Sequence, residues 1–475
     1  MGSAMPLPPH VVIFPIMAHG HTMPLLDLSK ALSHRGLRVT IITTPLNVPD
    51  IASKVSNHPK ISLRVLPFPK VPGLPEGCEN TAHLPSPDLI LPFFRATKML
   101  KHPFEGVLRE MSQTGCLPIC VVSDFFLEWT LDSCRLFGIP RFVSNGLGLL
   151  PMAALKAIHM QGLSSIRTMS ISDHVKLPQL NIPFAFVKGD FAENVQKGDD
   201  EDPWNLFITE VDKADVSSDG FIVNSFAELE GEYVATMESF LQNKANAWCV
   251  GPLYLMNNDQ VESETGGGDP KNLYMDWLDK QSVQNAVIYV SFGTQFPVSN
   301  SQMDEIAMGL EKAGQPFIWV AKTTKWSPPE GWEERVKGRG VLARDWVDQR
   351  SVLAHPSTGG FLTHCGWNSV LESLSSGVPL LAWPLGAEQG LNARYVVEGM
   401  GAGILVPCLH SLKVIGQDVI CDGVKELMAG ERGRRARERA QKLGVMARQA
   451  VEEGGSSDKK LDKLIRSLTC DKNGV

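Results

Sequence analysis

The stretch "HVVIFPIMAHGHTMPLLDLSKALSHRGLRVTIIT" (His10–Thr43) contains two apolar runs on either side of an amphipathic segment. Both ends are rich in Val and Ile, which is typical of buried strands. Between them, Leu25, Leu28 and Leu32 recur at helical spacing, and Gly36 follows as a helix-ending residue. "MAHGHT" is predicted to be a turn before this helix. A strand, helix and strand in this order predict two parallel strands with a right-handed crossover, and hence an α/β fold.

The same alternation continues and then restarts after a polar segment. "CVVSDFF" (Cys120–Phe126) and "AVIYVSFGT" (Ala286–Thr294) are further predicted strands followed by helical patterns. Between them lies "MNNDQVESETGGGDPKN" (Met256–Asn272), which has three consecutive glycines and almost no apolar residues, as linkers do. We therefore expect two α/β domains, with ligands bound at the carboxyl ends of their parallel strands.

Composition argues against several classes of function. The formal net charge is −7, whereas nucleic-acid-binding proteins usually carry a basic face. The basic run "ERGRRARERAQKL" (Glu431–Leu443) interleaves its charges at helical spacing, which indicates a solvated helix face. Nine cysteines without a C-x-x-C pair suit a reducing compartment, so we expect a cytoplasmic protein with free thiols. No segment reaches the roughly 18 uninterrupted apolar residues of a membrane span, so no stable membrane insertion is expected.

The stretch "GGFLTHCGWNSVLES" (Gly359–Ser373) concentrates polar side chains at a predicted strand-to-helix turn. Backbone N–H groups in the first turn of a helix lack intrahelical partners, so Asn368 and Ser369 are expected at an anion site. Gly366 would let a ligand approach the backbone closely, and His364 adds a side-chain donor. The turn therefore predicts a phosphate cradle.

Two other interpretations of this turn are weaker. A zinc site needs three or four convergent ligands, and the side chains of the adjacent His364 and Cys365 diverge on a strand. A Cys365 nucleophile would need a base that the sequence does not indicate, so a small buried thiol is the preferred interpretation.

From Trp346 to Gln389 the chain reads "WVDQRSVLAHPSTGGFLTHCGWNSVLESLSSGVPLLAWPLGAEQ" and resembles the signature box of plant family 1 UDP-dependent small-molecule glycosyltransferases. The resemblance extends, more loosely, over nearly the whole chain. It implies a GT-B fold, in which two α/β Rossmann-like domains face each other across a cleft. The implied parts are an acceptor-binding domain with the catalytic His (1–255), a linker (256–272), a UDP-sugar-binding domain (273–455) and a tail (456–475) that packs back on the N-terminal domain.

The resemblance also implies roles for residues of the box. Trp346 is expected to stack on uracil, a contact that needs a flat aromatic face. Val347 is expected to bond uracil through its backbone. The other expected UDP-binding residues are Gln349 and Glu372 at the ribose and His364, Gly366, Asn368, Ser369, Ser291 and Thr294 at the diphosphate. The expected sugar-binding residues are Trp367, Glu388 and Gln389.

Two residues of the box qualify what the family pattern implies. In this family a final Gln usually goes with glucose and a His with galactose, so Gln389 favours UDP-glucose as donor. The family usually opens the box with Trp-Ala-Pro-Gln, whereas this chain has Val347 and Asp348 in the middle positions. Since the implied uracil contact is made by the backbone, we expect nucleotide binding to be retained.

The resemblance places the chemistry on His21, with Asp124 as its partner. A neutral His is a suitable base near pH 7, and a carboxylate on its other nitrogen fixes the tautomer. His19, two residues earlier, is the less favoured alternative for the base. Attack opposite UDP would invert the anomeric configuration. No metal is expected, because a helix N-terminus and donors such as His364 can stabilise the departing diphosphate.

The expected acceptor is a small hydrophobic molecule: a flavonoid or other phenolic first, a terpenoid or steroid otherwise. Three segments rich in Phe, Leu, Met and Pro are candidates for its binding wall: Ser86–Leu100, Asn145–Met152 and Asn181–Phe191. The expected product is a β-O-glucoside made by a monomeric enzyme of plant secondary metabolism. The alternatives are C-glycosylation of a phenolic ring, a non-catalytic UDP-sugar-binding protein and a sugar-nucleotide epimerase. A dehydrogenase is disfavoured because no G-x-G-x-x-G follows the first strand.

Overall fold

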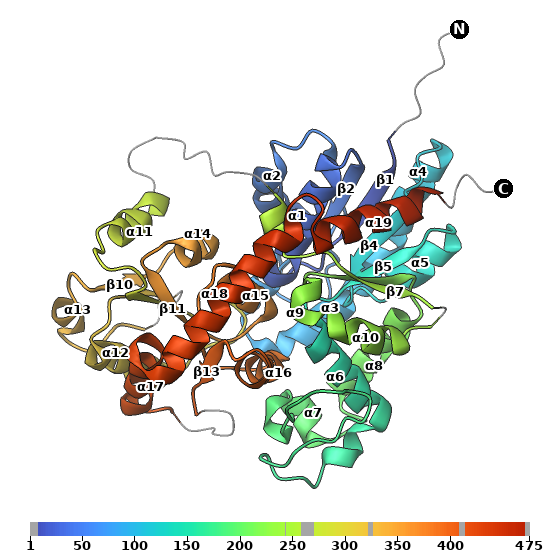
Figure 1. The fold of residues 1–475 in the computed structure, drawn as a ribbon. Coiled ribbons are helices and arrows are strands. Elements are labelled where there is room, and N and C mark those ends of the chain that lie inside the picture. Colours follow the sequence, from blue (N-terminus) through green and yellow to red (C-terminus); the bar gives the residue numbers. More distant parts are fainter. Residues whose placement is uncertain (1–7, 243, 258–269, 322–325, 408–413, 471–475) are drawn as a thin grey trace. The chain divides into compact units, whose positions relative to one another are not determined.

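The computed structural model describes residues 8–242, 244–257, 270–321, 326–407 and 414–470, so most of the predicted linker lies outside the described residues. The described residues form two compact units, each built on one parallel sheet (Figure 1). Unit 1 comprises those within Met1–His159, Glu201–Asn258 and Gln449–Val475, and unit 2 those within Met160–Asp200 and Asp259–Arg448. Two α/β units with parallel sheets are what the sequence predicts.

The described part of unit 1 contains a seven-stranded sheet in the order β3-β2-β1-β4-β5-β6-β7. The strands are β1 (His10–Phe14), β2 (Arg38–Thr43), β3 (Ile61–Val65), β4 (Cys120–Asp124), β5 (Arg141–Ser144), β6 (Gly220–Val223) and β7 (Asn246–Cys249). The α-helices are α1 (His19–His34), α2 (Val48–Val55), α3 (Ile90–Ala96), α4 (Lys101–Gln113), α5 (Thr130–Leu136), α6 (Leu149–Gln161, which runs into unit 2), α8 (Pro203–Val216), α9 (Ala227–Glu230), α10 (Val234–Ser239) and α19 (Ser456–Cys470).

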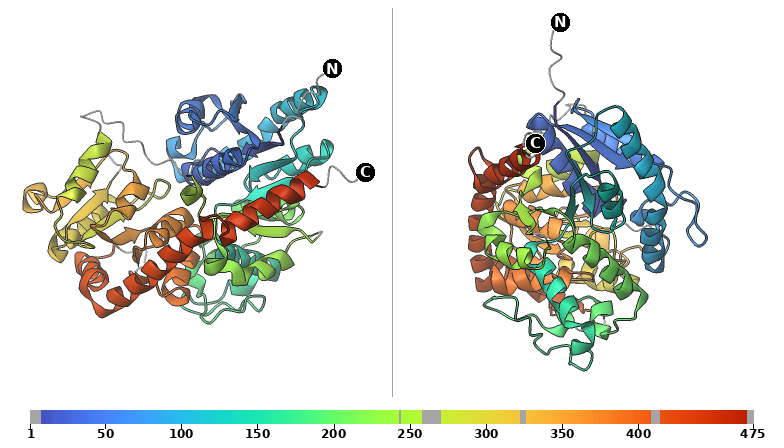
Figure 2. Two further views of the ribbon diagram at one scale, coloured as in Figure 1. Left: turned by 45° about the horizontal axis from the view of Figure 1, so that its top comes forward. Right: turned by 90° about the vertical axis from the view of Figure 1, so that its right-hand side faces the viewer.

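Both faces of the central strands of this sheet are buried, whereas the edge strand β3 is partly exposed. Along β1, Val11 and Ile13 belong to one core cluster, and Val12 and Phe14 to the other. This alternation follows from the two-residue period of a strand, with helices covering each face. The predicted tail contributes α19, which lies against β7 (Figures 1 and 2) and adds apolar residues such as Leu461 to the first cluster.

The described part of unit 2 contains a six-stranded sheet in the order β10-β9-β8-β11-β12-β13. The strands are β8 (Val287–Ser291), β9 (Phe317–Val320), β10 (Gly340–Ala343), β11 (Thr358–Thr363), β12 (Leu380–Ala382) and β13 (Gly403–Leu405). The α-helices are α7 (Glu193–Lys197), α11 (Pro270–Asp279), α12 (Asn300–Ala313), α13 (Trp332–Arg335), α14 (Gln349–Ala354), α15 (Trp367–Ser375), α16 (Gln389–Arg394), α17 (Gln417–Ala429) and α18 (Glu431–Val451, which runs into unit 1).

The grouping of residues 160–200 differs from the contiguous N-terminal domain predicted from the sequence, because these residues pack within unit 2. Arg394 of α16 donates hydrogen bonds of 3.0 and 3.1 Å to the buried carboxylate of Asp190. A Cβ added at Gly390 would lie 2.3 Å from the Asp190 carbonyl oxygen, so only glycine permits this approach. The aromatic rings of Phe184 and Tyr395 also stack, with centroids 6.3 Å apart.

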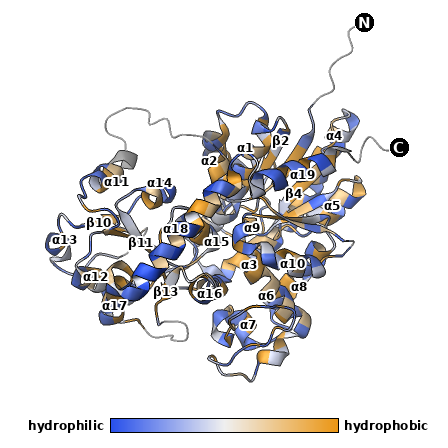
Figure 3. Ribbon diagram, viewed as in Figure 1, coloured by the Kyte–Doolittle hydropathy of each residue, from blue (hydrophilic) through white to orange (hydrophobic). Residues whose placement is uncertain are grey.

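The basic run at Glu431–Leu443 is a solvated helix face, as predicted. It lies on α18, which is largely hydrophilic in Figure 3. Its buried apolar side chains are Ala436, Ala440 and Leu443, while Arg434 is exposed and pairs with Glu431 and Glu438. The charges of Arg434 and Arg435 are therefore matched by carboxylates on the same helix, whereas Arg437 and Arg439 donate to backbone carbonyls.

Candidate active site

The chain order of the unit 1 sheet reverses between β1 and β4, and both predicted catalytic residues lie there. Phe14 of β1 is in register with Ser123 of β4, so the carboxyl ends of these strands are neighbours. His21 follows β1 and Asp124 is the last residue of β4. Such switch points are where open α/β sheets bind ligands. The prediction of a turn at His21 is wrong in detail, since α1 already begins at His19. The first turn of this helix is polar, so it lacks the apolar periodicity from which a helix is predicted.

Nδ1 of His21 lies 2.7 Å from Oδ2 of Asp124. The carboxylate is buried, with 1% of its side chain exposed, whereas His21 is 20% exposed. Since an ionised carboxylate only accepts, Nδ1 carries the proton and Nε2 is the basic atom of this tautomer. The second carboxylate oxygen accepts the backbone N–H of Phe126 at 3.0 Å, which fixes the orientation of Asp124.

Aromatic side chains surround the His21 ring. Phe125 stacks on it with centroids 5.9 Å apart and an interplanar angle of 19°. The ring centroids of Phe125 and Phe126 are 3.9 Å apart, and the Phe126 ring stacks on that of Phe94 with centroids 4.0 Å apart. Phe94 belongs to the predicted acceptor segment Ser86–Leu100, so this segment reaches the aromatic cluster beside the base. In contrast, Asn181–Phe191 belongs to unit 2.

The strand order of unit 2 reverses between β8 and β11, and the predicted phosphate cradle lies at that point. Ser291, the last residue of β8, is in register with Thr363, the last residue of β11. The loop with the exposed Thr294 follows β8, and the turn with His364 follows β11. The neighbouring strand ends bring together the two loops that the sequence analysis assigned to the diphosphate.

Two glycines approach the ring of His364 closely. A Cβ at Gly293 would lie 2.8 Å from Nε2 of His364, and one at Gly366 would lie 2.7 Å from it. Burial lowers the pKa of His364 to about 4, and a hydrogen bond with the Ser291 backbone opposes this shift only weakly. At pH 7 the imidazole is therefore neutral and can donate one N–H.

Gly366 is the N-cap of α15, so the first N–H groups of this helix are those of Trp367, Asn368 and Ser369. Trp367 is 2% exposed, so its indole ring is buried. Cys365 is fully buried and adopts a left-handed conformation with φ 66°. This buried thiol fits the small core residue predicted for the position.

Asn392 is a buried residue that the sequence analysis did not identify. Its Nδ2 donates to the Cys365 carbonyl at 2.8 Å and to Glu388 at 3.3 Å. Asn392 thus ties the HCGWN turn to the predicted sugar-binding residues. Nearby, Oε1 of Gln389 accepts the N–H groups of Leu385 and Gly386 at 2.9 and 3.1 Å, which fixes the orientation of its amide.

Gln349, Ser369 and Glu372 form one hydrogen-bonded group. Nε2 of Gln349 donates to Oγ of Ser369 at 3.0 Å and to Glu372 at 2.8 Å. Arg350 completes the group with an ion pair of 2.9 Å to Glu372. Arg350 was not predicted as a site residue, although it directly follows Gln349 in the box.

The unusual opening of the box forms a regular helix start. Asp348 is the N-cap of α14, and its carboxylate accepts the N–H groups of Arg350 and Ser351. Its φ of −71° is one that proline also adopts, so the backbone is compatible with the family's usual residue. Val347 is buried, whereas Trp346 is 50% exposed and presents an aromatic face.

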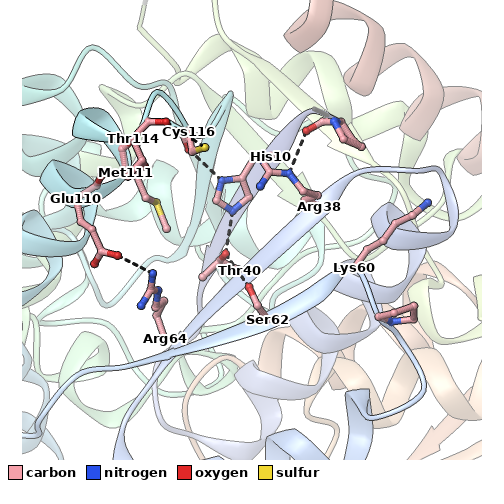
Figure 4. A pocket seen from close by; sticks show the side chains of 12 residues that line it. His10, Arg38, Thr40, Lys60, Ser62, Arg64, Glu110, Met111, Thr114 and Cys116 are labelled. Carbon is pink, nitrogen blue, oxygen red and sulfur yellow. Dashed lines mark hydrogen bonds and ion pairs between the residues drawn. The ribbon is translucent and has the colours of Figure 1, made fainter. Parts of the chain in front are cut away.

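A pocket of about 580 Å³ lies at the opposite ends of the unit 1 strands (Figure 4). His10, Arg38 and Ser62 line it, and His10 is the first residue of β1. In Figure 4, Nε2 of His10 bonds to Thr40, which bonds to Ser62. None of the predicted site residues lines this pocket, which is separate from the His21–Asp124 pair.

Comparison with known proteins settles the family. The family model described as UDP-glucoronosyl and UDP-glucosyl transferase matches residues 236–432, and the model described as Glycosyltransferase, N-terminal domain matches residues 9–255. UDP-glycosyltransferase 90A1 of Arabidopsis thaliana is 39% identical over 98% of this chain and 98% of its own length. The chain belongs to the plant family 1 UDP-glycosyltransferases.

Two solved structures support the GT-B fold of this glycosyltransferase. UGT73P12 of Glycyrrhiza uralensis, complexed with glycyrrhetinic acid 3-O-monoglucuronide, has a TM-score of 0.84 and 29% identity, over 98% of this chain and 96% of that one. UGT2 of Phytolacca americana, complexed with UDP-2fluoro-glucose and pterostilbene, has a TM-score of 0.81 and 29% identity, over 97% of this chain and 100% of that one. The predicted family, fold and enzyme class are therefore confirmed.

Two further observations concern the described part of the glycosyltransferase. Among those residues, no group of three or more His, Cys, Asp or Glu side chains could hold a metal ion. Within the same ranges, every helix is too short or too polar to cross a membrane.

Proposed function

We propose that the enzyme transfers glucose from UDP-glucose to a hydroxyl group of a small hydrophobic acceptor, with inversion. Nε2 of His21 takes the proton of the acceptor hydroxyl. The acceptor oxygen forms a bond to the anomeric carbon, and the bond from that carbon to the UDP phosphate oxygen breaks. UDP leaves with the electron pair, and the α-linked donor becomes a β-glucoside.

The hydrogen bond between His21 and Asp124 is the observation that carries this proposal. It holds the imidazole with Nε2 basic, and the buried carboxylate stabilises the imidazolium that forms. General base catalysis of this kind contributes about 10²–10⁴-fold to a rate. A non-catalytic UDP-sugar-binding protein would have no use for such a pair.

The donor half of the proposal rests on unit 2. The N–H groups at the start of α15 and the neutral His364 offer donors to a diphosphate, and the buried Ser291 and exposed Thr294 lie at the adjacent strand end. Glu372, whose orientation is held by Gln349 and Arg350, is proposed to accept ribose hydroxyls. The exposed Trp346 is proposed to stack on uracil.

Two observations support the proposed substrates. The amide of Gln389 has a fixed orientation, because its oxygen accepts two backbone N–H groups. In this orientation it is proposed to bind sugar hydroxyls together with Glu388 and the backbone of Trp367. The Phytolacca enzyme was solved with a UDP-glucose analogue and the phenol pterostilbene. The aromatic cluster at Phe125 and Phe126 suits a flat phenolic acceptor, although the Glycyrrhiza complex contains a larger, non-phenolic ligand.

We also propose that turnover needs no metal ion. The dipole and N–H groups of α15 would neutralise charge on the leaving diphosphate. Activity after EDTA treatment and desalting should match the untreated enzyme. A loss restored by Mg²⁺ or Mn²⁺ would overturn this part of the proposal.

The test is a transfer assay with mass spectrometry. The full chain is incubated with UDP-glucose, UDP-galactose or UDP-glucuronic acid, alone and with flavonoid, simple phenolic and terpenoid acceptors. We expect hexose addition from UDP-glucose to a phenolic, in an acid-labile product. An acid-stable product would indicate a C-glucoside, and preference for another donor would contradict the role of Gln389. Tight UDP binding without product on any acceptor would favour the binding-protein alternative.

A further inference from the structure

Directly behind the His21–Asp124 pair, unit 1 contains a fully buried guanidinium. Arg141 is the first residue of β5 and is 0% exposed. Its Nε lies 2.9 Å from Oγ of Ser123 and 2.9 Å from Oγ1 of Thr130. Nη2 donates to the backbone carbonyl of Asp124 at 3.4 Å. Three of its contacts therefore surround the end of β4 that carries the catalytic carboxylate.

The remaining contacts of Arg141 point toward α8. Nη1 donates to Oγ of Ser218 at 2.8 Å and lies 3.6 Å from the carboxylate of Asp215. Burial raises the pKa of Asp215 to about 7, so this carboxylate is protonated for much of the time near neutral pH. The other titratable groups that act on Arg141 are Cys134, Glu128 and Asp124.

A buried cation is costly unless its charge is compensated, so its position needs a reason. The pKa of Cys134 is raised to about 12 by burial, which keeps this thiol neutral. Burial also raises the pKa of Glu128, and its carboxylate pairs with Lys98. Asp124 is 1% exposed and accepts from His21. Of these acids, Asp124 is the one that the proposed mechanism uses.

We propose that Arg141 is a positioning residue of the catalytic pair. It holds the end of β4 through Ser123 and the Asp124 carbonyl, ties this end to α5 through Thr130, and places a buried positive charge behind the residue that bonds His21. This inference rests on the proposed function, in which His21 is the base.

The charge and the hydrogen bonds of Arg141 can be separated by two substitutions. Arg141→Met removes the positive charge, which should move the acid limb of the kcat/KM profile upward by about 1 pH unit. Arg141→Lys keeps the charge but cannot make all the contacts. It should leave the acid limb in place and lower kcat about 10-fold, with the KM for UDP-glucose unchanged.

A second pair of variants covers the case in which Arg141→Met does not fold. Thr130→Val removes a guanidinium contact on the Asp124 side, and Ser218→Ala removes one on the α8 side. Thr130→Val should lower kcat at least 5-fold, whereas Ser218→Ala should stay within 2-fold of the wild type. Circular dichroism and thermal unfolding confirm that each variant is folded.

The proposal is overturned if folded Arg141→Met keeps the wild-type acid limb, or if Thr130→Val and Ser218→Ala affect kcat equally. A purely structural arginine would lower the Tm in all four variants without moving the pH profile. If instead His21→Ala retained full turnover, the proposed function itself would fail, whatever the Arg141 variants showed.

Discussion

Gly293→Ala should weaken UDP binding by displacing the His364 ring. The added methyl group would lie 2.8 Å from Nε2 and 2.9 Å from Cε1 of His364. The ring has little room near this atom, because Gly366 also approaches Nε2 so closely that a Cβ there would lie 2.7 Å from it. If the displaced imidazole loses one hydrogen bond to the charged diphosphate, the loss is about 1.5–3 kcal/mol, or roughly 10- to 150-fold in Kd.

The matched control is Gly314→Ala in the same unit. Gly293 and Gly314 have φ values of 72° and 79°, so alanine is strained at both by about 1–2 kcal/mol. A Cβ at Gly314 would meet nothing within 4 Å. Both variants share the backbone strain, and Gly293→Ala adds the clash with His364, so it should lose at least as much stability as Gly314→Ala. Only Gly293→Ala should bind UDP more weakly in isothermal titration calorimetry. Wild-type affinity in Gly293→Ala, or equal losses in both, would refute the role of His364.

Three further predictions concern stability. Asp348→Ala removes the N-cap of α14 and should lower the free energy of unfolding by about 1 kcal/mol in urea titrations. Arg394→Ala leaves the buried Asp190 carboxylate without its ion pair and should lower the free energy of unfolding by about 3 kcal/mol. Lys337→Ala breaks an exposed ion pair and should lower it by less than about 0.5 kcal/mol. Equal effects would contradict a stabilising role for the buried Arg394–Asp190 pair. The pKa of Asp215 in the folded protein, about 7, exceeds its ordinary value of 3.8, so its ionisation opposes folding. The stability of the wild type relative to Asp215→Asn should therefore fall as the pH rises from about 4 to 7 and level off above, and a pH-independent difference would contradict this shift.

The sequence predicted the parts of the structure that depend on local patterns. Alternating apolar runs located β1 and β2, because each strand is buried on both faces of a parallel sheet. The order of strands then placed His21 and Asp124 at the same sheet edge, where they bond at 2.7 Å. The start of α1 was missed, since its first turn at His19 is polar and contains Gly20.

Other features had no local signal. The packing of residues 160–200 on α16 depends on Asp190 meeting Arg394, 204 positions away in the chain. Asn392 looks like an ordinary helix residue until its amide is found on the Cys365 carbonyl. Asp348 departed from the family pattern, but a capping carboxylate and a φ of −71° preserve the helix start by different chemistry.

The role of His21 as base is the central claim, and one pair of measurements on His21→Ala tests it most directly. UDP affinity is measured by calorimetry, and turnover is measured with saturating UDP-glucose and the acceptor identified in the transfer assay. We predict that kcat falls at least 100-fold while the Kd for UDP stays within 2-fold of the wild type. Turnover close to that of the wild type, or parallel losses of turnover and UDP binding, would contradict the claim.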